Sequence, residues 1–163
     1  MKRPTPPNLL VSAQRVVVLG RGGAGKTTAA VQLGRVTGLP VLELDQSFWS
    51  AGLTPMPLSA WAETQHDLAA GSRWIMDGDL GPYDVLAPRL GRADTVLILD
   101  FGLFRCAWRA LRRSRERADF WWWLLTWRWR SRPAVLCAVA THAPEADVYV
   151  VRTPRHLRHL LGQ

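Results

Sequence analysis

One eight-residue stretch restricts this chain to a small group of folds. Residues 20–27 read Gly-Arg-Gly-Gly-Ala-Gly-Lys-Thr and match the pattern G-x-x-x-x-G-K-[ST] without a gap. A short β-branched run, residues 15–19, precedes the stretch, and a helix-favouring segment begins at Lys26. A strand, a glycine-rich turn and a helix in this order form a phosphate-binding loop, or P-loop, because its backbone N–H groups and the helix N-terminus attract phosphate. The stretch therefore predicts an α/β fold that binds a nucleotide.

We expect this loop to bind ATP together with Mg²⁺. Its glycines let the backbone curl around a phosphate chain, and Lys26 is placed to reach the outer phosphates. The hydroxyl of Thr27 is the expected protein ligand of Mg²⁺ at the loop. The expected ATP-binding residues here are Gly20, Gly22, Gly23, Ala24, Gly25, Lys26, Thr27 and Thr28.

The rest of the chain alternates between short apolar runs and helical patterns. We predict strands over residues 15–19, 40–44, 73–76, 95–99 and 148–151. We predict helices over residues 26–36, 58–70, 103–115, 120–130, 133–142 and 154–161. This alternation is typical of a parallel sheet, whose ligands bind beyond the carboxyl ends of the strands. We interpret residues 1–163 as a single domain in which residues 1–13 form a loose tail.

Acidic residues follow two of the predicted strands. Asp77 directly follows an apolar strand, as a carboxylate that helps to hold Mg²⁺ should, and Gly78 leaves room for a ligand beside it. Asp45 lies at the end of another strand, where it would orient or deprotonate the hydroxyl of a phosphoryl acceptor. Glu43 and Asp79 lie at the same ends of these strands, on the side of the P-loop. For these two residues an ordinary loop position is an equally good interpretation.

A basic segment rich in tryptophan sets this chain apart. The Trp-rich segment, residues 119–132, holds five of the nine tryptophans and three arginines. From Arg105 to Arg132 there are nine arginines against Glu116 and Asp119, so this region carries most of the net charge of +8. A local basic block on a nearly neutral body indicates an anionic ligand or partner at one place. Arg109 and Arg113 share a helical face and suit phosphate because guanidinium groups donate in a fixed fork.

The order of these motifs resembles the adenylate-kinase-related P-loop proteins, in particular a branch often labelled DNA topology modulation protein. The resemblance covers residues 15–160 and is carried by the P-loop, LDQSFW at 44–49, WIMDGD at 74–79 and ADTVLILD at 93–100. Single residues also fall in the family's places: Trp61, Arg89, Cys106, Arg109 and Arg113. It implies an α/β P-loop NTPase fold of the nucleoside-monophosphate-kinase type. Its five-stranded parallel sheet would have the order 2-3-1-4-5, with helices on both faces.

The resemblance also implies roles for individual residues. Arg109 and Arg113 would stand at the base of a mobile lid, at about residues 112–132, and neutralise the transferring phosphoryl group. Arg152 would lie beside the adenine, and Arg89 would contact the phosphoryl acceptor. Asp79 departs from the branch, which has asparagine there, and a carboxylate at that point repels an anionic acceptor such as AMP.

The function expected from these observations is transfer of the γ-phosphoryl group of ATP to a small acceptor. In this interpretation the Trp-rich segment is a helix flanking the lid, with tryptophans packed on the body and arginines near the phosphates. Since that helix is apolar almost all round, a homodimer partner or the closing lid would cover its second face.

Two other functions remain open for the same segment. It would also suit an ATP-switched nucleic-acid-binding protein, because arginine and tryptophan bind phosphates and stack on bases. It would equally suit an interfacial membrane anchor. Nothing outside residues 105–132 supports nucleic acid as a partner, and no apolar run is long enough to span a bilayer. We therefore expect no membrane partner and a cytoplasmic location.

Overall fold

The computed structural model describes residues 10, 12–48, 56–81, 84–113 and 118–162. Its sheet has five strands, β1 (Arg15–Gly20), β2 (Val41–Glu43), β3 (Trp74–Asp77), β4 (Thr95–Leu99) and β5 (Asp147–Val151). All neighbouring strands are parallel and their order is β2-β3-β1-β4-β5. The predicted fold class, a parallel sheet in the order 2-3-1-4-5 between helices, is confirmed.

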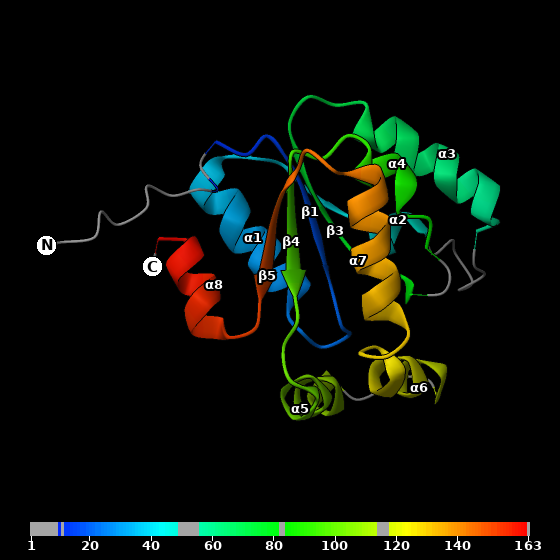
Figure 1. Cartoon of the computed structure of the whole chain (residues 1–163), viewed down its shortest axis with the longest axis vertical. Helices are drawn as coiled ribbons and strands as arrows, with labels where there is room; N and C mark the ends of the chain where they lie inside the picture. The colour runs from blue at the N-terminus through cyan, green and yellow to red at the C-terminus, as the bar shows by residue number, and fades with distance from the viewer. Residues whose placement is uncertain (1–9, 11, 49–55, 82–83, 114–117, 163) are drawn as a thin grey trace, which may run out of the picture.

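The helices cover both faces of this sheet. They are α1 (Lys26–Thr37), α2 (Leu44–Phe48), α3 (Leu58–Ala69), α4 (Ala87–Leu90), α5 (Leu103–Arg113), α6 (Ala118–Thr126), α7 (Ser131–His142) and α8 (Pro154–Leu160). Figure 1 shows α1 and α8 on one side of the strands and α3, α4 and α7 on the other. The strands are nearly continuous apolar runs because both of their faces are covered.

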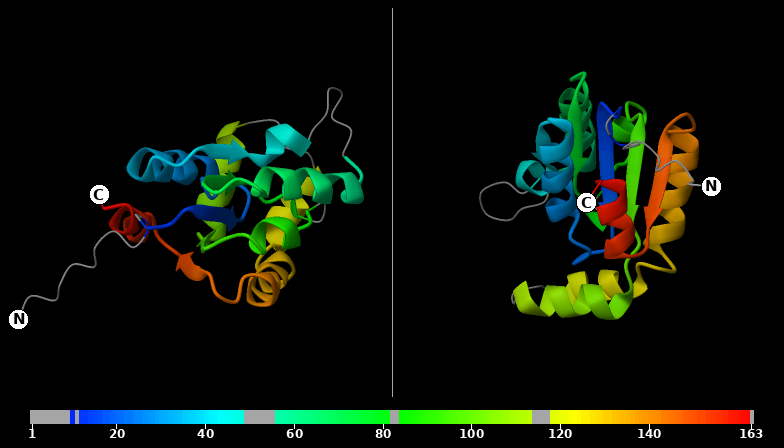
Figure 2. Two further views of the ribbon diagram at one scale, coloured as in Figure 1. Left: turned by 90° about the horizontal axis from the view of Figure 1, so that it is seen from above. Right: turned by 90° about the vertical axis from the view of Figure 1, so that its left-hand side faces the viewer.

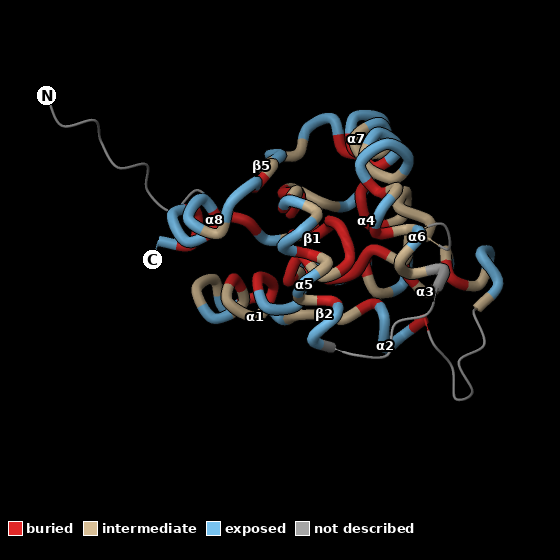
Figure 3. Tube along the Cα trace, turned by 90° about the horizontal axis from the view of Figure 1, so that it is seen from below, coloured by how far each residue is buried: buried red, intermediate tan, exposed pale blue. Residues whose placement is uncertain are grey.

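Alternate side chains of β1 supply two separate cores. Val16 and Val18 belong to the core under α1 and α8, whereas Val17 and Leu19 belong to the core under α3, α4 and α7. This division follows from the two-residue period of a strand. Figure 3 shows the buried positions gathered along the strands in the middle of the molecule, with exposed positions on the outer helices.

Helices α5 and α6 lie across one end of the sheet instead of along a face. Figures 1 and 2 show both helices beyond the carboxyl end of β4, which is also the end where β1 runs into α1. Ligands of open α/β sheets bind at this end. The basic and aromatic part of the chain therefore covers the place where the P-loop lies.

The Trp-rich segment is not one helix, which corrects our expectation. Helix α6 ends at Thr126, residues 127–130 form turns, and α7 begins at Ser131. The carbonyl of Thr126 accepts from the N–H groups of both Trp129 and Arg130, at 3.0 and 2.9 Å. The turn brings Trp127 into the core, where it is fully buried. Arg128 consequently lies in the turn and Arg132 in α7, so the two do not share the face of one helix.

Two further expectations need adjustment. The short helices α2 and α4 were not predicted, and α2 begins at Leu44, which we assigned to the end of a strand. Leu10 and Ala13, which we assigned to a loose tail, are buried in the core beneath α1. Both residues are apolar, so contact with the core removes their surface from water.

Candidate functional site

The P-loop is a tight turn between β1 and α1 that depends on glycine. Gly23 and Gly25 have φ angles of 73° and 88°, which side chains with a Cβ rarely adopt. The N–H of Ala24 donates to the carbonyl of Arg21 at 3.1 Å and closes the turn. Gly25 is the N-cap of α1, so the positive end of that helix faces the loop. This backbone fits the phosphate-binding role that we expected for residues 20–28.

Lys26 is held across the loop by its own backbone. Its ammonium group donates to the carbonyls of Gly20 and Arg21 at 3.0 and 3.3 Å. These bonds fix the positive charge beside the P-loop. A bound phosphate would replace the two neutral carbonyl groups as the partner of the ammonium group. Thr27 and Thr28 lie on the first turn of α1 and are exposed. Both are therefore open to a ligand at the loop.

The acidic residues of the neighbouring strands meet at this rim. Asp77 ends β3, is aligned with Val18 of β1 and Glu43 of β2, and is only 4% exposed. Asp45 follows β2 at the start of α2, and its Oδ1 lies close to Gly78. A Cβ added to Gly78 would come within 3.6 Å of that oxygen. The structure therefore brings Asp45 and Asp77 together next to the P-loop.

Asp45 lies in an electrostatic environment shared with Lys26. The pKa of Asp45 is raised because the surrounding chain removes water from its carboxyl group, although the residue as a whole is exposed. The charge of Lys26 opposes this change, while Asp77 and Asp84 add to it. Such a carboxylate holds a proton more readily than an isolated aspartate, as an acid–base group requires.

Of the three arginines predicted to lie at the ATP site, the structure places Arg109 at the loop. A Cβ added to Gly25 would lie 2.9 Å from one of the terminal nitrogens of Arg109, so the guanidinium group rests against the P-loop. Arg113 ends α5, and its side chain lies outside the described part. Arg152 is exposed beyond β5, with its Nε 4.0 Å from a carboxylate oxygen of Asp100. The structure thus places Arg109 against the same loop as Lys26, whereas Arg152 lies beside Asp100.

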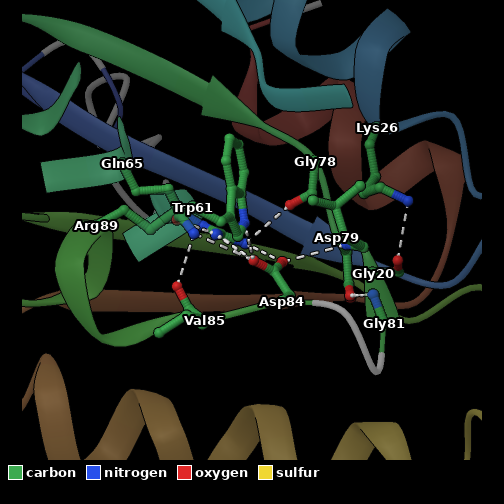
Figure 4. Close-up of polar contacts among 11 residues, drawn as sticks. Gly20, Lys26, Trp61, Gln65, Gly78, Asp79, Gly81, Asp84, Val85 and Arg89 are labelled. Carbon is green, nitrogen blue, oxygen red and sulfur yellow. Dashed lines mark hydrogen bonds and ion pairs between the residues drawn. The ribbon is translucent and has the colours of Figure 1, made fainter. Parts of the chain in front are cut away.

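Arg89 is engaged inside the protein. Its guanidinium group donates to the two carboxylate oxygens of Asp84 at 2.8 and 2.6 Å and to the carbonyl of Gly78 at 3.1 Å. It also donates to Gln65, and the residue is 0% exposed. Figure 4 shows these groups converging on Asp84. Arg89 therefore holds the loop after β3 in place, and its expected contact with the acceptor stays a prediction.

Sequence reasoning missed Asp84 as the centre of this network. Burial alone would raise its pKa, but the facing Arg89 guanidinium and the hydrogen bonds from Leu80 and Trp61 lower the pKa below its ordinary value. Trp61 and Gln65 come from α3 and donate to Asp84 or its neighbour Val85. Leu80 and Arg89 lie within five residues of Asp84, but Trp61 and Gln65, which complete the network, come from α3 and could not be assigned to it from the local sequence.

The aromatic side chains of α6 and the following turn contact the P-loop directly. A Cβ added to Gly22 would collide with the rings of Phe120 and Trp123. The Trp123 ring centre lies 5.9 Å from the Lys26 ammonium group, and the Trp127 ring centre lies 5.3 Å from the guanidinium carbon of Arg21. Burial also lowers the pKa of Arg21. These contacts confirm that tryptophans of the segment pack on the body, and they show that the site of packing is the P-loop.

The arginines of the Trp-rich segment do not all lie near the loop. Arg132 donates to Asp100 at 2.9 Å, which fastens the start of α7 to the end of β4. Arg128 and Arg130 are exposed. The exposed large aromatic side chains of α5, α6 and the following turn are Phe104, Trp108, Trp122 and Trp129.

A cavity of about 600 Å³ lies beside the aromatic helix. Its wall is formed by the loop after β3, by α6 and by α7, and it includes Asp79, Gly81 and Trp123. A Cβ added to Gly81 would lie 2.8 Å from the indole nitrogen of Trp123, so this side chain separates the P-loop from the cavity. A volume of this size suits a small-molecule ligand.

Comparison with known proteins supports the fold. No model of a protein family matches the sequence. No curated protein matches it either. Similar solved structures are a shikimate kinase from Acinetobacter baumannii in complex with shikimate, a sugar kinase from Janibacter sp. and a gluconokinase from Sinorhizobium meliloti.

These three structures match almost the whole chain at low identity. The shikimate kinase has a TM-score of 0.61 at 16% identity and covers 96% of this chain and 93% of its own. The sugar kinase has a TM-score of 0.54 at 21% identity, covering 88% and 89%. The gluconokinase also has a TM-score of 0.54, at 15% identity, covering 91% and 90%. At such identities the likeness establishes the fold.

Within the described residues, no helix is both long enough and apolar enough to cross a bilayer.

Proposed function

We propose that this chain is a Mg-ATP-dependent phosphotransferase that acts on a hydroxyl group of a small molecule. The observation that carries the proposal is the meeting of opposite charges at one end of the sheet. Lys26 and Arg109 lie against the P-loop, and Asp45 and Asp77 face it from the neighbouring strands. Phosphoryl transfer needs this combination, because cations stabilise the transferring group while carboxylates orient the attacking hydroxyl and hold the metal.

Each residue has a distinct part in the proposed reaction. Residues 20–28 bind the phosphates of ATP, and Lys26 and Arg109 neutralise the γ-phosphoryl group. Asp45 accepts a hydrogen bond from the attacking hydroxyl and takes its proton. A bond forms between the hydroxyl oxygen and the γ-phosphorus while the bond from that phosphorus to the bridging oxygen breaks, so ADP leaves. Arg113 is proposed to join Arg109 as the lid closes, and Arg152 to lie beside the adenine.

The residues present fit a Mg²⁺ ion bound together with ATP. Asp77 is buried next to the start of the P-loop, and Thr27 is exposed on the first turn of α1. We propose that these two side chains are the protein's ligands. When bound, the ion would offset negative charge on the phosphates.

The aromatic cover supports transfer to an acceptor over transfer to water. Phe120 and Trp123 contact Gly22, and Trp123 also borders the cavity beside α6. Apolar rings at this boundary exclude water, which otherwise competes with the acceptor hydroxyl and weakens electrostatic stabilisation. We propose that residues 112–132 act as the lid and that the chain is related to the adenylate-kinase-like P-loop proteins.

A second candidate function rests on the outward-facing aromatic side chains. Trp108 is 62% exposed with Arg112 stacked on it at 5.6 Å, and Trp129 is 75% exposed between Arg128 and Arg130. Exposed tryptophan beside arginine suits base stacking and phosphate contacts of single-stranded nucleic acid. An ATP-switched nucleic-acid-binding protein would use this face, and a homodimer through it stays a prediction.

The decisive experiment measures ADP release in a coupled assay with a panel of hydroxyl-bearing acceptors. We expect acceptor-dependent turnover in the wild type and loss of at least 10²-fold in Lys26→Ala, since one cation at the transferring group is worth that much. Arg35→Ala, an exposed change in the last turn of α1, is the control. The phosphotransferase proposal fails if Lys26→Ala retains full turnover. Salt-sensitive binding of single-stranded DNA without acceptor-dependent turnover would instead support the second candidate.

A further inference from the structure

One carboxylate in the wall of the cavity beside α6 is only partly satisfied by hydrogen bonds. Asp79 is 9% exposed and lines the cavity. Its Oδ1 accepts from the N–H of Gly81 at 3.0 Å, while Oδ2 has no hydrogen-bond partner among the described residues. A buried carboxylate oxygen without a partner is costly, because the group has lost its water. An arrangement of this kind is expected where a ligand supplies the missing donor.

The neighbouring carboxylate is satisfied within the protein. Asp84 also lines the cavity, but both of its oxygens receive hydrogen bonds from Arg89, and Leu80 and Trp61 donate as well. Figure 4 shows Asp79 outside this network, on the side of Asp84 toward Lys26. Since Arg89 neutralises Asp84, Asp79 is the carboxylate in this wall that remains to meet a ligand.

Asp79 also stands near the place of phosphoryl transfer. Burial raises the pKa of Asp79 and the charge of Lys26 opposes this change, so the carboxyl group lies within electrostatic reach of the P-loop. A ligand in the cavity that donates to Oδ2 would therefore direct its donor end toward the phosphates. A hydroxyl group can supply this donor, whereas an ionised phosphate or carboxylate group offers only acceptors to an oxygen that lacks a donor.

The rest of the cavity wall indicates what the ligand carries behind this hydroxyl. Val85, Leu86, Ala134 and Val135 are apolar, and Trp123 together with the more exposed Trp122 offers aromatic surface. Flat or ring-shaped molecules stack on such surfaces. Arg130 and His142, which lie at opposite ends of α7, are exposed members of the same wall.

We propose that this cavity binds the phosphoryl acceptor as a hydroxylated ring compound whose reacting end carries no phosphate or carboxylate, and that Asp79 Oδ2 accepts a hydrogen bond from its hydroxyl group. The inference rests on the proposed phosphotransferase function and names the substrate class of that site. Nucleosides and uncharged cyclic polyols belong to this class. Nucleoside monophosphates that react at their phosphate do not.

The test uses matched pairs of acceptors that differ in one anionic group. Suitable pairs are a nucleoside with its 5′-monophosphate, and an uncharged cyclitol with the corresponding ring carboxylic acid. The full-length wild type should favour at least one uncharged member over its anionic partner by tenfold or more in kcat/KM. Asp79→Asn should lower kcat/KM for that member by about 10–100-fold, the worth of a hydrogen bond to a charged group. The same variant should raise the relative use of the anionic partner.

A conservative control and a binding measurement separate this inference from the proposed function. Asp67→Asn removes an exposed carboxylate on α3 and should leave the preference unchanged. Tryptophan emission is titrated with each acceptor in the absence of ATP, because Trp122 and Trp123 line the cavity. The uncharged member should change the emission of the wild type at lower concentration than its partner, and Asp79→Asn should remove that difference.

The outcomes are distinct. Turnover in which the wild type favours the anionic members, or in which Asp79→Asn keeps the wild-type preference, overturns the inference while the phosphotransferase function stands. Equal emission changes with both members of every pair also overturn it. If Mg-ATP does not bind the wild type and Lys26→Ala changes nothing, the proposed function fails, whatever the emission titrations give.

Discussion

The indole ring of Trp123 faces the ammonium group of Lys26 at 5.9 Å, and the same indole lies against Gly22 and Gly81. Its nitrogen donates to the hydroxyl of Ser131 at 3.1 Å. One side chain of α6 thereby contacts the phosphate-binding loop, the loop after β3 and the start of α7. A ligand that enters on either side of this ring changes its environment, so Trp123 should report on occupancy.

Tryptophan emission should change when both ligands are present. We expect Mg-ATP with an acceptor to shift or quench the emission more than Mg-ATP alone, because the acceptor reaches the other face of Trp123. Trp123→Phe should remove most of this extra change, whereas Trp129→Phe, which alters a side chain 75% exposed, should keep it. Vesicles of anionic lipid and single-stranded DNA should have little effect at physiological salt. Emission that follows lipid or DNA and not nucleotide would refute the lid assignment.

Asp77→Asn should weaken the dependence of turnover on Mg²⁺. The change keeps the shape of the side chain but removes the buried negative charge next to the P-loop. We expect turnover to fall by about 10²-fold, the usual cost of one lost electrostatic contact in the transition state. Initial rates measured across a range of Mg²⁺ concentrations check this, with Asp67→Asn as the control. A variant that differs only in thermal stability would show that Asp77 is a structural residue.

Arg109→Ala should reduce turnover more than ATP affinity. Its guanidinium group lies against Gly25, so its charge acts where the phosphoryl group moves. We expect a loss of about 10³-fold or more in kcat, with a smaller change in ATP binding. Arg113→Ala should show the same imbalance if Arg113 joins the site on lid closure. Arg105→Ala on the same helix, where the arginine packs on Phe101 at 5.9 Å, is the control. Equal losses in turnover and affinity would indicate plain binding of the ground state.

Asp84→Asn should destabilise the protein strongly. The side chains of Arg89 and Asp84 are 0% and 3% exposed, so the variant leaves a buried guanidinium group without its counter-charge. Breaking such a pair costs about 3–5 kcal/mol, which lowers Tm by about 10 °C for a chain of this size. Differential scanning calorimetry measures the change. The double variant Asp84→Leu with Arg89→Met should recover part of the loss, and if it is as unstable as the single variant, burial of the charge is not the cause.

The same pair sets the response of stability to acid. The pKa of Asp84 is lower in the folded protein than in the unfolded chain, where the pKa of an aspartate is about 3.9. Its contribution is therefore complete above that pH and is lost as the pH falls through the lower, folded pKa. The wild type should lose stability below about pH 4 more steeply than Asp84→Asn. Parallel acid profiles of the two proteins would contradict this assignment.

The sequence by itself determined the P-loop, the five strands and their functional end. Each of these features lies within one short run of residues: the P-loop in residues 20–27, and β4 in an apolar run predicted with its observed bounds, Thr95–Leu99. Asp77 could be placed beside the loop because parallel strands finish at the same edge of the sheet. Glycine spacing, apolar runs and parallel pairing are local or nearest-neighbour rules, so they can be read without a structure.

The tertiary structure decided the partners of the charged and aromatic side chains. Arg89 carries no local sign that it pairs with Asp84, since the geometry depends on Trp61 and Gln65 from α3. The break after Thr126 was missed because the helical pattern continues through it, whereas burial of Trp127 beneath Arg21 favours a turn. Asp79 looks like any loop acid until the cavity and its unpartnered oxygen are seen. These outcomes depend on which distant segments meet, because burial and charge compensation belong to the packed molecule as a whole and are not encoded in any one run of residues.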